Sequence, residues 1–120
     1  MGDTYFFDTY AFFEIIRGNP KYEKYRDALA ITTIFNLAEL NYGLKKEMGQ
    51  KEADEITEKY VSLIVEVNIN DVKEAMNLKI NQKKLSIPDS IGYIIAKNKK
   101  VKFLTGDEDF KNMRNVEFAK

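Results

Sequence analysis

Hydrophobic and polar residues alternate along the chain in blocks whose spacing changes repeatedly from that of a buried strand to that of an amphipathic helix. Short apolar runs between turn residues predict strands, and apolar residues at every third or fourth position predict helices. The predicted strands cover residues 4–8, 29–33, 64–67 and 101–105, with a short edge strand at 116–118. The predicted helices cover residues 10–16, 21–28, 34–48, 52–63, 70–83 and 88–97, with a last turn at 108–113.

This alternation of strands and helices predicts the fold class. Strands that are separated by helices of this length form a parallel sheet whose two faces are both covered by helices. We therefore expect an α/β protein with three layers, α/β/α, around a central parallel sheet. The length of 120 residues suits a single domain spanning residues 1–120, since chains of this size build one core.

Five acidic residues lie where this fold would bring side chains together: Asp8, Glu39, Asp89, Asp107 and Asp109. Asp8 closes the first apolar run, Asp107 follows the fourth strand, Glu39 lies in the helix after the second strand, and Asp89 starts an apolar helix. In an open parallel sheet the carboxyl ends of the strands form the crevice in which ligands bind. Carboxylates that meet there raise one another's pKa unless a hard cation neutralises them. The pattern therefore predicts a metal site.

Helix capping is an alternative explanation for several of these acids. Asp8 could accept hydrogen bonds from the free N–H groups at the start of the next helix. Ser86 and Asp89 fit a capping box, and Thr105 and Glu108 fit another. The second box would explain Glu108 and leave Asp107 and Asp109 less constrained.

Glu39 is the acid that capping does not explain, because it lies in the second turn of its helix. Phe35, Tyr42 and Gly43 share its helix face at the i−4, i+3 and i+4 positions. A carboxylate partly buried among such groups is costly unless it is paired or bound to a metal. The alternatives that remain open are a salt bridge to a lysine and a solvated position at the margin of the apolar stripe.

The sequence contains no histidine and no cysteine. Without histidine there is no Ser-His-Asp triad, no imidazole base and no histidine-ligated zinc. Without cysteine there are no disulfides, thiolate ligands or cysteine nucleophiles. Any acid–base or metal chemistry must therefore use carboxylates, water and lysine.

Charge and hydropathy limit the partners. Lysine and arginine total 19 and so do aspartate and glutamate, so bulk attraction to nucleic acid is not expected, although local patches could still bind it. No apolar run approaches the ~20 residues that span a bilayer. The N-terminus lacks the charged and apolar regions of a signal peptide. We therefore expect a cytoplasmic protein, which the lack of cysteine also fits.

Four segments, in order and at their spacings, resemble the PIN domain, and within it the VapC-type toxins of toxin–antitoxin pairs. The segments are Tyr5-Phe6-Phe7-Asp8-Thr9, Asn36-Leu37-Ala38-Glu39-Leu40, Ile87-Pro88-Asp89 and Leu104-Thr105-Gly106-Asp107-Glu108-Asp109-Phe110. The last of these is similar to the family's late Thr-x-Asp-x-Asp-Phe segment. The resemblance covers essentially the whole chain, and the four segments together are more specific than any one of them.

The resemblance implies a sheet order of 3-2-1-4-5, which would make the first and fourth strands neighbours. It also implies that Asp8, Glu39, Asp89 and Asp107 form a catalytic quartet that holds Mg²⁺ or Mn²⁺ and hydrolyses phosphodiester bonds in RNA. Asp109 matches a second late acid whose role varies in the family. With Asp8, Asp89 and Asp107 it completes the expected set of metal ligands.

Two hydroxyl side chains match positions beside this site in the family. Thr105 corresponds to a hydroxyl next to the acids, and Thr9 to a position where many relatives carry a serine. The resemblance further implies an RNA substrate, a cognate VapB-type antitoxin and a homodimer.

Two other functions compete with a metal-dependent endoribonuclease. A non-catalytic PIN domain that binds RNA or protein usually lacks acids of the quartet, and here none is lost. A haloacid dehalogenase-like phosphatase has a similar late acidic loop. That superfamily needs a second aspartate two residues after its nucleophile, where this chain has Tyr10. We therefore expect a metal-dependent endoribonuclease.

Overall fold

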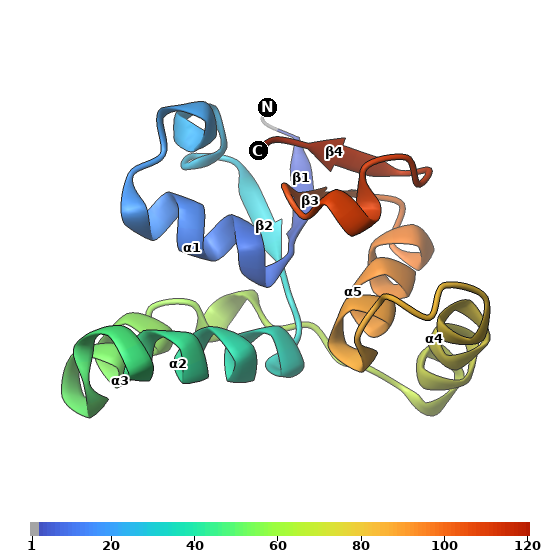
Figure 1. The fold of residues 1–120 in the computed structure, drawn as a ribbon, viewed down its shortest axis with the longest axis horizontal. Helices are drawn as coiled ribbons and strands as arrows, with labels where there is room; N and C mark the ends of the chain where they lie inside the picture. The colour runs from blue at the N-terminus through green and yellow to red at the C-terminus, as the bar shows by residue number, and fades with distance from the viewer. Residues whose placement is uncertain (1–2) are drawn as a thin grey trace.

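The computed structural model describes residues 3–120 as four strands, five α-helices and three short 3₁₀ helices (Figure 1). The strands are β1 (Thr4–Phe7), β2 (Leu29–Ile31), β3 (Lys102–Thr105) and β4 (Val116–Phe118). The α-helices are α1 (Thr9–Arg17), α2 (Ile34–Met48), α3 (Gln50–Glu58), α4 (Ile69–Asn81) and α5 (Ile87–Asn98). The 3₁₀ helices are η1 (Pro20–Tyr25), η2 (Val61–Leu63) and η3 (Glu108–Phe110). None of these helices is long and apolar enough to cross a bilayer.

The four strands form one sheet in the order β2-β1-β3-β4, and every pair is parallel. Phe6 of β1 pairs with Ile31 of β2 on one side and with Phe103 of β3 on the other. The parallel sheet predicted from the alternation of elements is therefore confirmed. Because the strands run in one direction, their carboxyl ends meet at a single edge, where Asp8 follows β1 and Asp107 lies two residues after β3.

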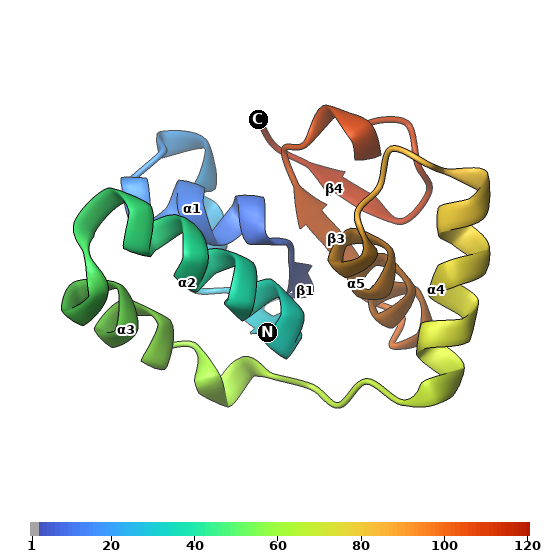
Figure 2. The same ribbon diagram turned by 60° about the horizontal axis from the view of Figure 1, so that its bottom comes forward.

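Helices cover both faces of the sheet, which confirms the expected three layers. Successive strand residues point to opposite faces. Phe6 stacks on Phe103 at 5.4 Å between ring centroids and packs in the core shared with α5 and α4. Phe7 packs with Phe12 and Leu104 in the core shared with α1, α2 and α3. Figure 2 shows α1, α2 and α3 on one side of β1 and β3, and α4 and α5 on the other.

The strand expected at residues 64–67 shrinks to a single parallel bridge between Thr32 and Ile64. Only two backbone hydrogen bonds hold this segment against the end of β2, from Thr32 N to Leu63 O and from Val65 N to Thr32 O. The bridge lies on the β2 side of the sheet, where the order 3-2-1-4-5 places the third strand. The predicted fourth and fifth strands are β3 and β4, so the observed order β2-β1-β3-β4 agrees with the expected order of these four strands.

Two predicted helices are shorter than expected. The segment 21–28 forms only the 3₁₀ helix η1, which opens at Pro20 with the Asn19 side chain accepting from Lys21 N. The segment 52–63 divides into α3 and η2, because Tyr60 leaves helical geometry (φ −105°, ψ 2°) and packs on Phe12 at 4.7 Å between ring centroids. The tertiary contact of Tyr60 ends a helix that local periodicity would extend.

The close approach of α5 to the sheet depends on Gly92. A Cβ atom at this position would lie 2.9 Å from Cε1 of Phe6 and 3.3 Å from Cε1 of Phe103. A larger residue would therefore push α5 away from β1 and β3. The approach matters for the site because the first turn of α5 carries Asp89.

Candidate active site

Asp8 follows β1 in the N-cap position of α1, but its side chain makes no capping hydrogen bond. Its carboxylate instead accepts a 2.7 Å hydrogen bond from the hydroxyl of Thr105, at the end of β3. Asp8 is only 3% exposed. The capping explanation for Asp8 is therefore wrong, and the residue is a buried carboxylate held between two strand ends.

Burial changes the acidity of Asp8. It raises the pKa of this carboxyl group from 3.8 to about 8, and the negative charge of Asp89 is the next cause, with a small further contribution from Glu39. The hydrogen bond from Thr105 acts in the opposite direction and lowers the pKa, but it does not outweigh burial. A buried carboxyl group that faces other acids stays protonated near neutral pH unless a cation stabilises its charged form.

Asp89 combines a structural contact with a position in the site. Its side chain accepts from Ser86 N at 3.1 Å, and the Ser86 hydroxyl accepts from Asp89 N at 3.1 Å, which confirms the predicted capping box. Burial also raises the pKa of Asp89, and the charges of Asp107 and Asp109 add to this effect. Capping therefore explains where Asp89 lies without removing it from the acidic group.

Glu39 is half-buried, and its Oε1 atom accepts a 3.0 Å hydrogen bond from the hydroxyl of Thr9. The pKa of Glu39 is raised, mainly by burial and also by the charge of Asp89. No lysine or arginine of residues 3–120 pairs with Glu39, so the salt-bridge alternative is wrong for the described chain.

The late acidic segment does not form the predicted box between Thr105 and Glu108. The Thr105 hydroxyl accepts from Asp107 N at 3.0 Å, and the Asp107 side chain caps η3 by accepting from Asp109 N at 2.9 Å. Glu108 turns toward Lys120, with 3.4 Å between Oε1 and Nζ. The capping box does not form because the Thr105 hydroxyl already donates to Asp8 and accepts from Asp107 N.

Four of the five predicted acids meet in one open cleft of about 460 Å³. The lining residues are Asp8, Thr9, Tyr10, Phe13, Glu39, Tyr42, Ser86, Asp89 and Asp107. Asp109 does not line this cleft but lies near enough to Asp89 to act on its pKa. Thr105 does not line the cleft, but its hydroxyl donates to Asp8, which does. The cleft therefore gathers residues from the carboxyl edge of the sheet and from three helices.

Asn36 is a site residue that the sequence analysis did not single out. It is fully buried in the first turn of α2, where its side chain accepts from the Thr33 hydroxyl at 2.7 Å and donates to the Thr9 hydroxyl at 3.2 Å. Thr9 in turn donates to Glu39. The local signals for Asn36 were its position three residues after a capping threonine and its place at the start of the segment Asn36–Leu40 that resembles the PIN domain.

The donor set suits a hard cation such as Mg²⁺ or Mn²⁺, because it consists of carboxylate and hydroxyl oxygens. None of the five acids forms an ion pair with a basic residue within residues 3–120. No three acids in that range lie close enough together to hold one ion jointly. Mg²⁺ keeps several waters and binds proteins through one or two carboxylates, so the residues fit it without a preformed cage.

The sequence profile of the PIN domain family matches residues 5–116. No curated protein matches the chain in sequence.

Solved structures of similar fold include a toxin–antitoxin complex from Klebsiella pneumoniae, with 19% identity and a TM-score of 0.74, covering 93% of this chain and 94% of that one. VapBC2 from Rickettsia felis, bound to a DNA fragment from its promoter, has 16% identity and a TM-score of 0.73, with 97% of both chains covered. VapBC-5 from Mycobacterium tuberculosis has 18% identity and a TM-score of 0.69, with 98% of both chains covered. At these identities the similarity concerns the fold alone.

Proposed function

The chain belongs to the PIN domain family, and on this premise we propose that it is a divalent-metal-dependent endoribonuclease, the VapC-type toxin of a toxin–antitoxin pair. The observation that carries the proposal is the cleft lined by Asp8, Glu39, Asp89 and Asp107, none of which has a basic partner among residues 3–120. Such a cleft repels anions until a cation neutralises it. It is suited to hold a metal ion beside a phosphodiester.

One or two of Asp8, Asp89 and Asp107 would bind Mg²⁺ or Mn²⁺ directly and the others through its waters, with Asp109 as a further candidate ligand. When bound, the metal would supply an acidic water as nucleophile and would neutralise charge on the phosphate. Thr105 orients the Asp8 carboxylate by its 2.7 Å hydrogen bond. This contact also supports the charged form of Asp8 that a metal requires.

Glu39 would accept the proton of the attacking water. Its Oε1 atom is held by the Thr9 hydroxyl, so Oε2 is the oxygen available for this proton. A raised pKa suits this role, because a carboxylate accepts a proton better when its pKa approaches the working pH. Asn36 would act through Thr9 as a positioning residue.

The likeness in fold to toxin–antitoxin complexes supports the toxin assignment and a VapB-type antitoxin as partner. An antitoxin segment that places an arginine or lysine among Asp8, Glu39, Asp89 and Asp107 would form charge-assisted hydrogen bonds and displace the metal. We include a homodimer in the proposal on the family resemblance alone.

The test is to incubate the purified protein with structured RNAs in Mg²⁺, in Mn²⁺ and in EDTA. We expect metal-dependent cleavage that leaves 5′-phosphate and 3′-hydroxyl ends, since water is the proposed nucleophile. Activity in EDTA, or 2′,3′-cyclic phosphate products, would mean that the 2′-hydroxyl of the RNA attacks and would contradict the proposal. Binding of RNA without cleavage would favour the non-catalytic alternative.

Expression in a host cell tests the toxin assignment separately. The wild-type chain alone should arrest growth, and the Asp8→Asn variant should not. Equal growth with both would leave a PIN domain whose toxin role is not supported.

A further inference from the structure

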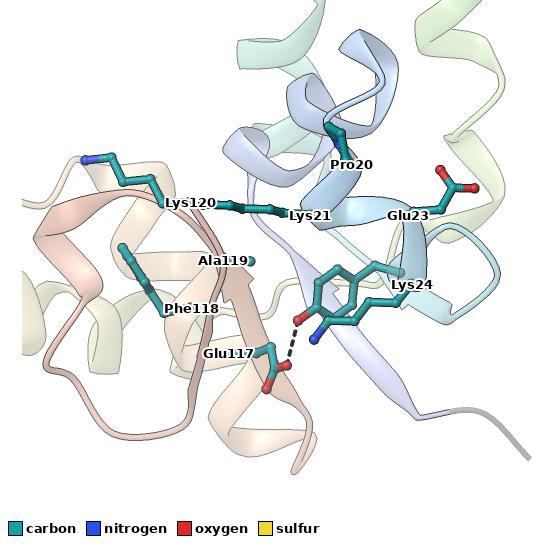
Figure 3. Close-up of a pocket in the computed structure, with 9 residues that line it drawn as sticks. Pro20, Lys21, Glu23, Lys24, Glu117, Phe118, Ala119 and Lys120 are labelled. Atoms are coloured by element: carbon teal, nitrogen blue, oxygen red, sulfur yellow. Dashed lines mark hydrogen bonds between the residues drawn. The ribbon is translucent and has the colours of Figure 1, made fainter.

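A second groove, of about 750 Å³, lies between η1 and β4 (Figure 3). Three lysines line it: Lys21 and Lys24 from η1, and Lys120 after β4. Phe118 also borders the groove, but its ring points to the other face of β4 from Glu117, where Lys111 lies over it at 5.8 Å (Figure 3). Because β4 is parallel to the other strands, its end lies at the same edge of the sheet as the acidic cleft.

The groove and the acidic cleft are neighbours, separated by a wall built around Gly106. A Cβ atom on Gly106 would lie 2.3 Å from the carbonyl oxygen of Ala119, which lines the groove, and 2.3 Å from Cε1 of Tyr10, which lines the cleft. Lys120 lies at this junction, with its Nζ atom 3.4 Å from Glu108, the residue after Asp107. A polymer that leaves the cleft on this side would enter the groove.

The two η1 lysines are available to a ligand. Lys21 and Lys24 are three residues apart in a 3₁₀ helix, so their side chains emerge on the same side. Both are exposed, and neither forms an ion pair with a carboxylate of residues 3–120. Lys24 lies over the Tyr25 ring at 5.2 Å, and Figure 3 shows its side chain extending across the groove toward Glu117.

The groove also contains two carboxylates, but each has a partner. Glu117 accepts a 2.6 Å hydrogen bond from the Tyr25 hydroxyl, drawn as a dashed line in Figure 3. Glu23 lies 3.9 Å from Nε of Arg26. The Tyr25 hydroxyl is neutral and does not cancel the charge of Glu117, so two lysines and one carboxylate without an ion pair among residues 3–120 remain in the groove, an excess of positive charge.

We propose that this groove is the track along which single-stranded RNA reaches the acidic cleft, with Lys21 and Lys24 contacting backbone phosphates. The inference rests on the proposed ribonuclease function and adds the binding surface to it. A chain with zero net charge and an acidic cleft has no bulk attraction for RNA, so affinity must come from a local basic surface.

The test measures binding of a fluorescein-labelled single-stranded RNA by anisotropy, in Mg²⁺ and on an Asp8→Asn background that blocks cleavage. Adding Lys21→Gln and Lys24→Gln should weaken binding roughly 20-fold at 0.1 M salt and lower the salt slope of log K by about 1.4, as expected for two lost phosphate contacts on a single strand. A matched control changes Lys51 and Lys73, two exposed lysines on α3 and α4 that line neither cavity, to glutamine. The control should bind like its parent.

The track would be overturned if the two double variants had the same RNA affinity and the same salt slope, whether both matched their parent or both bound RNA more weakly. Melting temperatures of the double variants check that each is folded. The two proposals can fail separately. If the wild-type chain cleaves RNA but the Lys21 and Lys24 changes do not weaken RNA binding, only the track is overturned. If the Lys21 and Lys24 variant loses binding but the wild-type chain cleaves no RNA, the nuclease proposal is overturned and the RNA-binding groove remains.

Discussion

The hydroxyl of Thr105 donates a 2.7 Å hydrogen bond to the carboxylate of Asp8, from a position 97 residues further along the chain. The same hydroxyl oxygen accepts from Asp107 N at 3.0 Å. Thr105, at the end of β3, thus holds both the carboxylate of Asp8 and the backbone of Asp107. The contact joins the ends of β1 and β3. Its loss should therefore change both the stability of the fold and the pKa of Asp8.

Replacing Thr105 by valine should destabilise the folded protein by about 1–3 kcal/mol, because a buried carboxyl group and a backbone N–H both lose their partner. Thr105→Ser is the matched control, since it keeps the hydroxyl. The free energies of unfolding from urea titrations compare the two. A valine variant as stable as the serine variant would show that the hydroxyl has no net effect.

The metal-free protein should lose stability as the pH rises from about 4 to about 8. The pKa of Asp8 is raised to about 8 in the folded state, against 3.8 as its ordinary value. Between these values the folded state holds a proton at Asp8 that the unfolded state has released, so rising pH favours unfolding. The stability of the wild type in EDTA should therefore fall relative to Asp8→Asn across this range. Parallel profiles for the two proteins would contradict the raised pKa.

Mg²⁺ or Mn²⁺ should raise the melting temperature at pH 8. A ligand that binds only the folded state stabilises it by about 2.7 kcal/mol at a concentration 100 times its Kd. Asp89→Asn and Asp107→Asn should each reduce this gain, with ionic strength matched by NaCl in every sample. An equal metal-induced shift in wild type and both variants would place the metal elsewhere on the protein.

Asparagine and alanine at position 89 should separate the capping role of Asp89 from its role in the site. Both changes remove the charge and should abolish RNA cleavage. Only alanine also removes the acceptor for Ser86 N, so Asp89→Ala should be about 1 kcal/mol less stable than Asp89→Asn. Calorimetry and a cleavage assay on both variants give the two readouts. RNA cleavage by Asp89→Ala would show that Asp89 only stabilises the start of α5 and takes no part in the reaction.

Glu39→Gln should reduce cleavage about 100-fold or more, the usual contribution of a positioned proton acceptor, while the protein stays folded. The glutamine oxygen can still accept from the Thr9 hydroxyl, so the local hydrogen bond is retained. Glu52→Gln, an exposed change on α3, is the control and should cleave like the wild type. Wild-type activity in Glu39→Gln would remove this residue from the site.

The sequence by itself determined the parallel three-layer fold and four of the acids that line the cleft. Continuous apolar runs such as Tyr5-Phe6-Phe7 indicate strands buried on both faces, and helical spacing between them leaves little choice of architecture. An acid directly after such a strand must lie at the carboxyl edge of the sheet. The family profile over residues 5–116 and the strand order agree with this expectation.

The tertiary structure alone decided which groups each acid contacts. Local pattern allowed Asp8 and Asp89 the same explanation as caps, yet Asp89 caps α5 and Asp8 bonds to a strand that is adjacent only in space. The local sequence pattern also could not show that the Thr9 hydroxyl donates to Glu39 or that the strand at 64–67 is reduced to one bridge. Sequence spacing governs contacts within a turn or a strand, whereas burial and the contacts between distant residues depend on which elements pack together. The pKa of Asp8 follows from that packing.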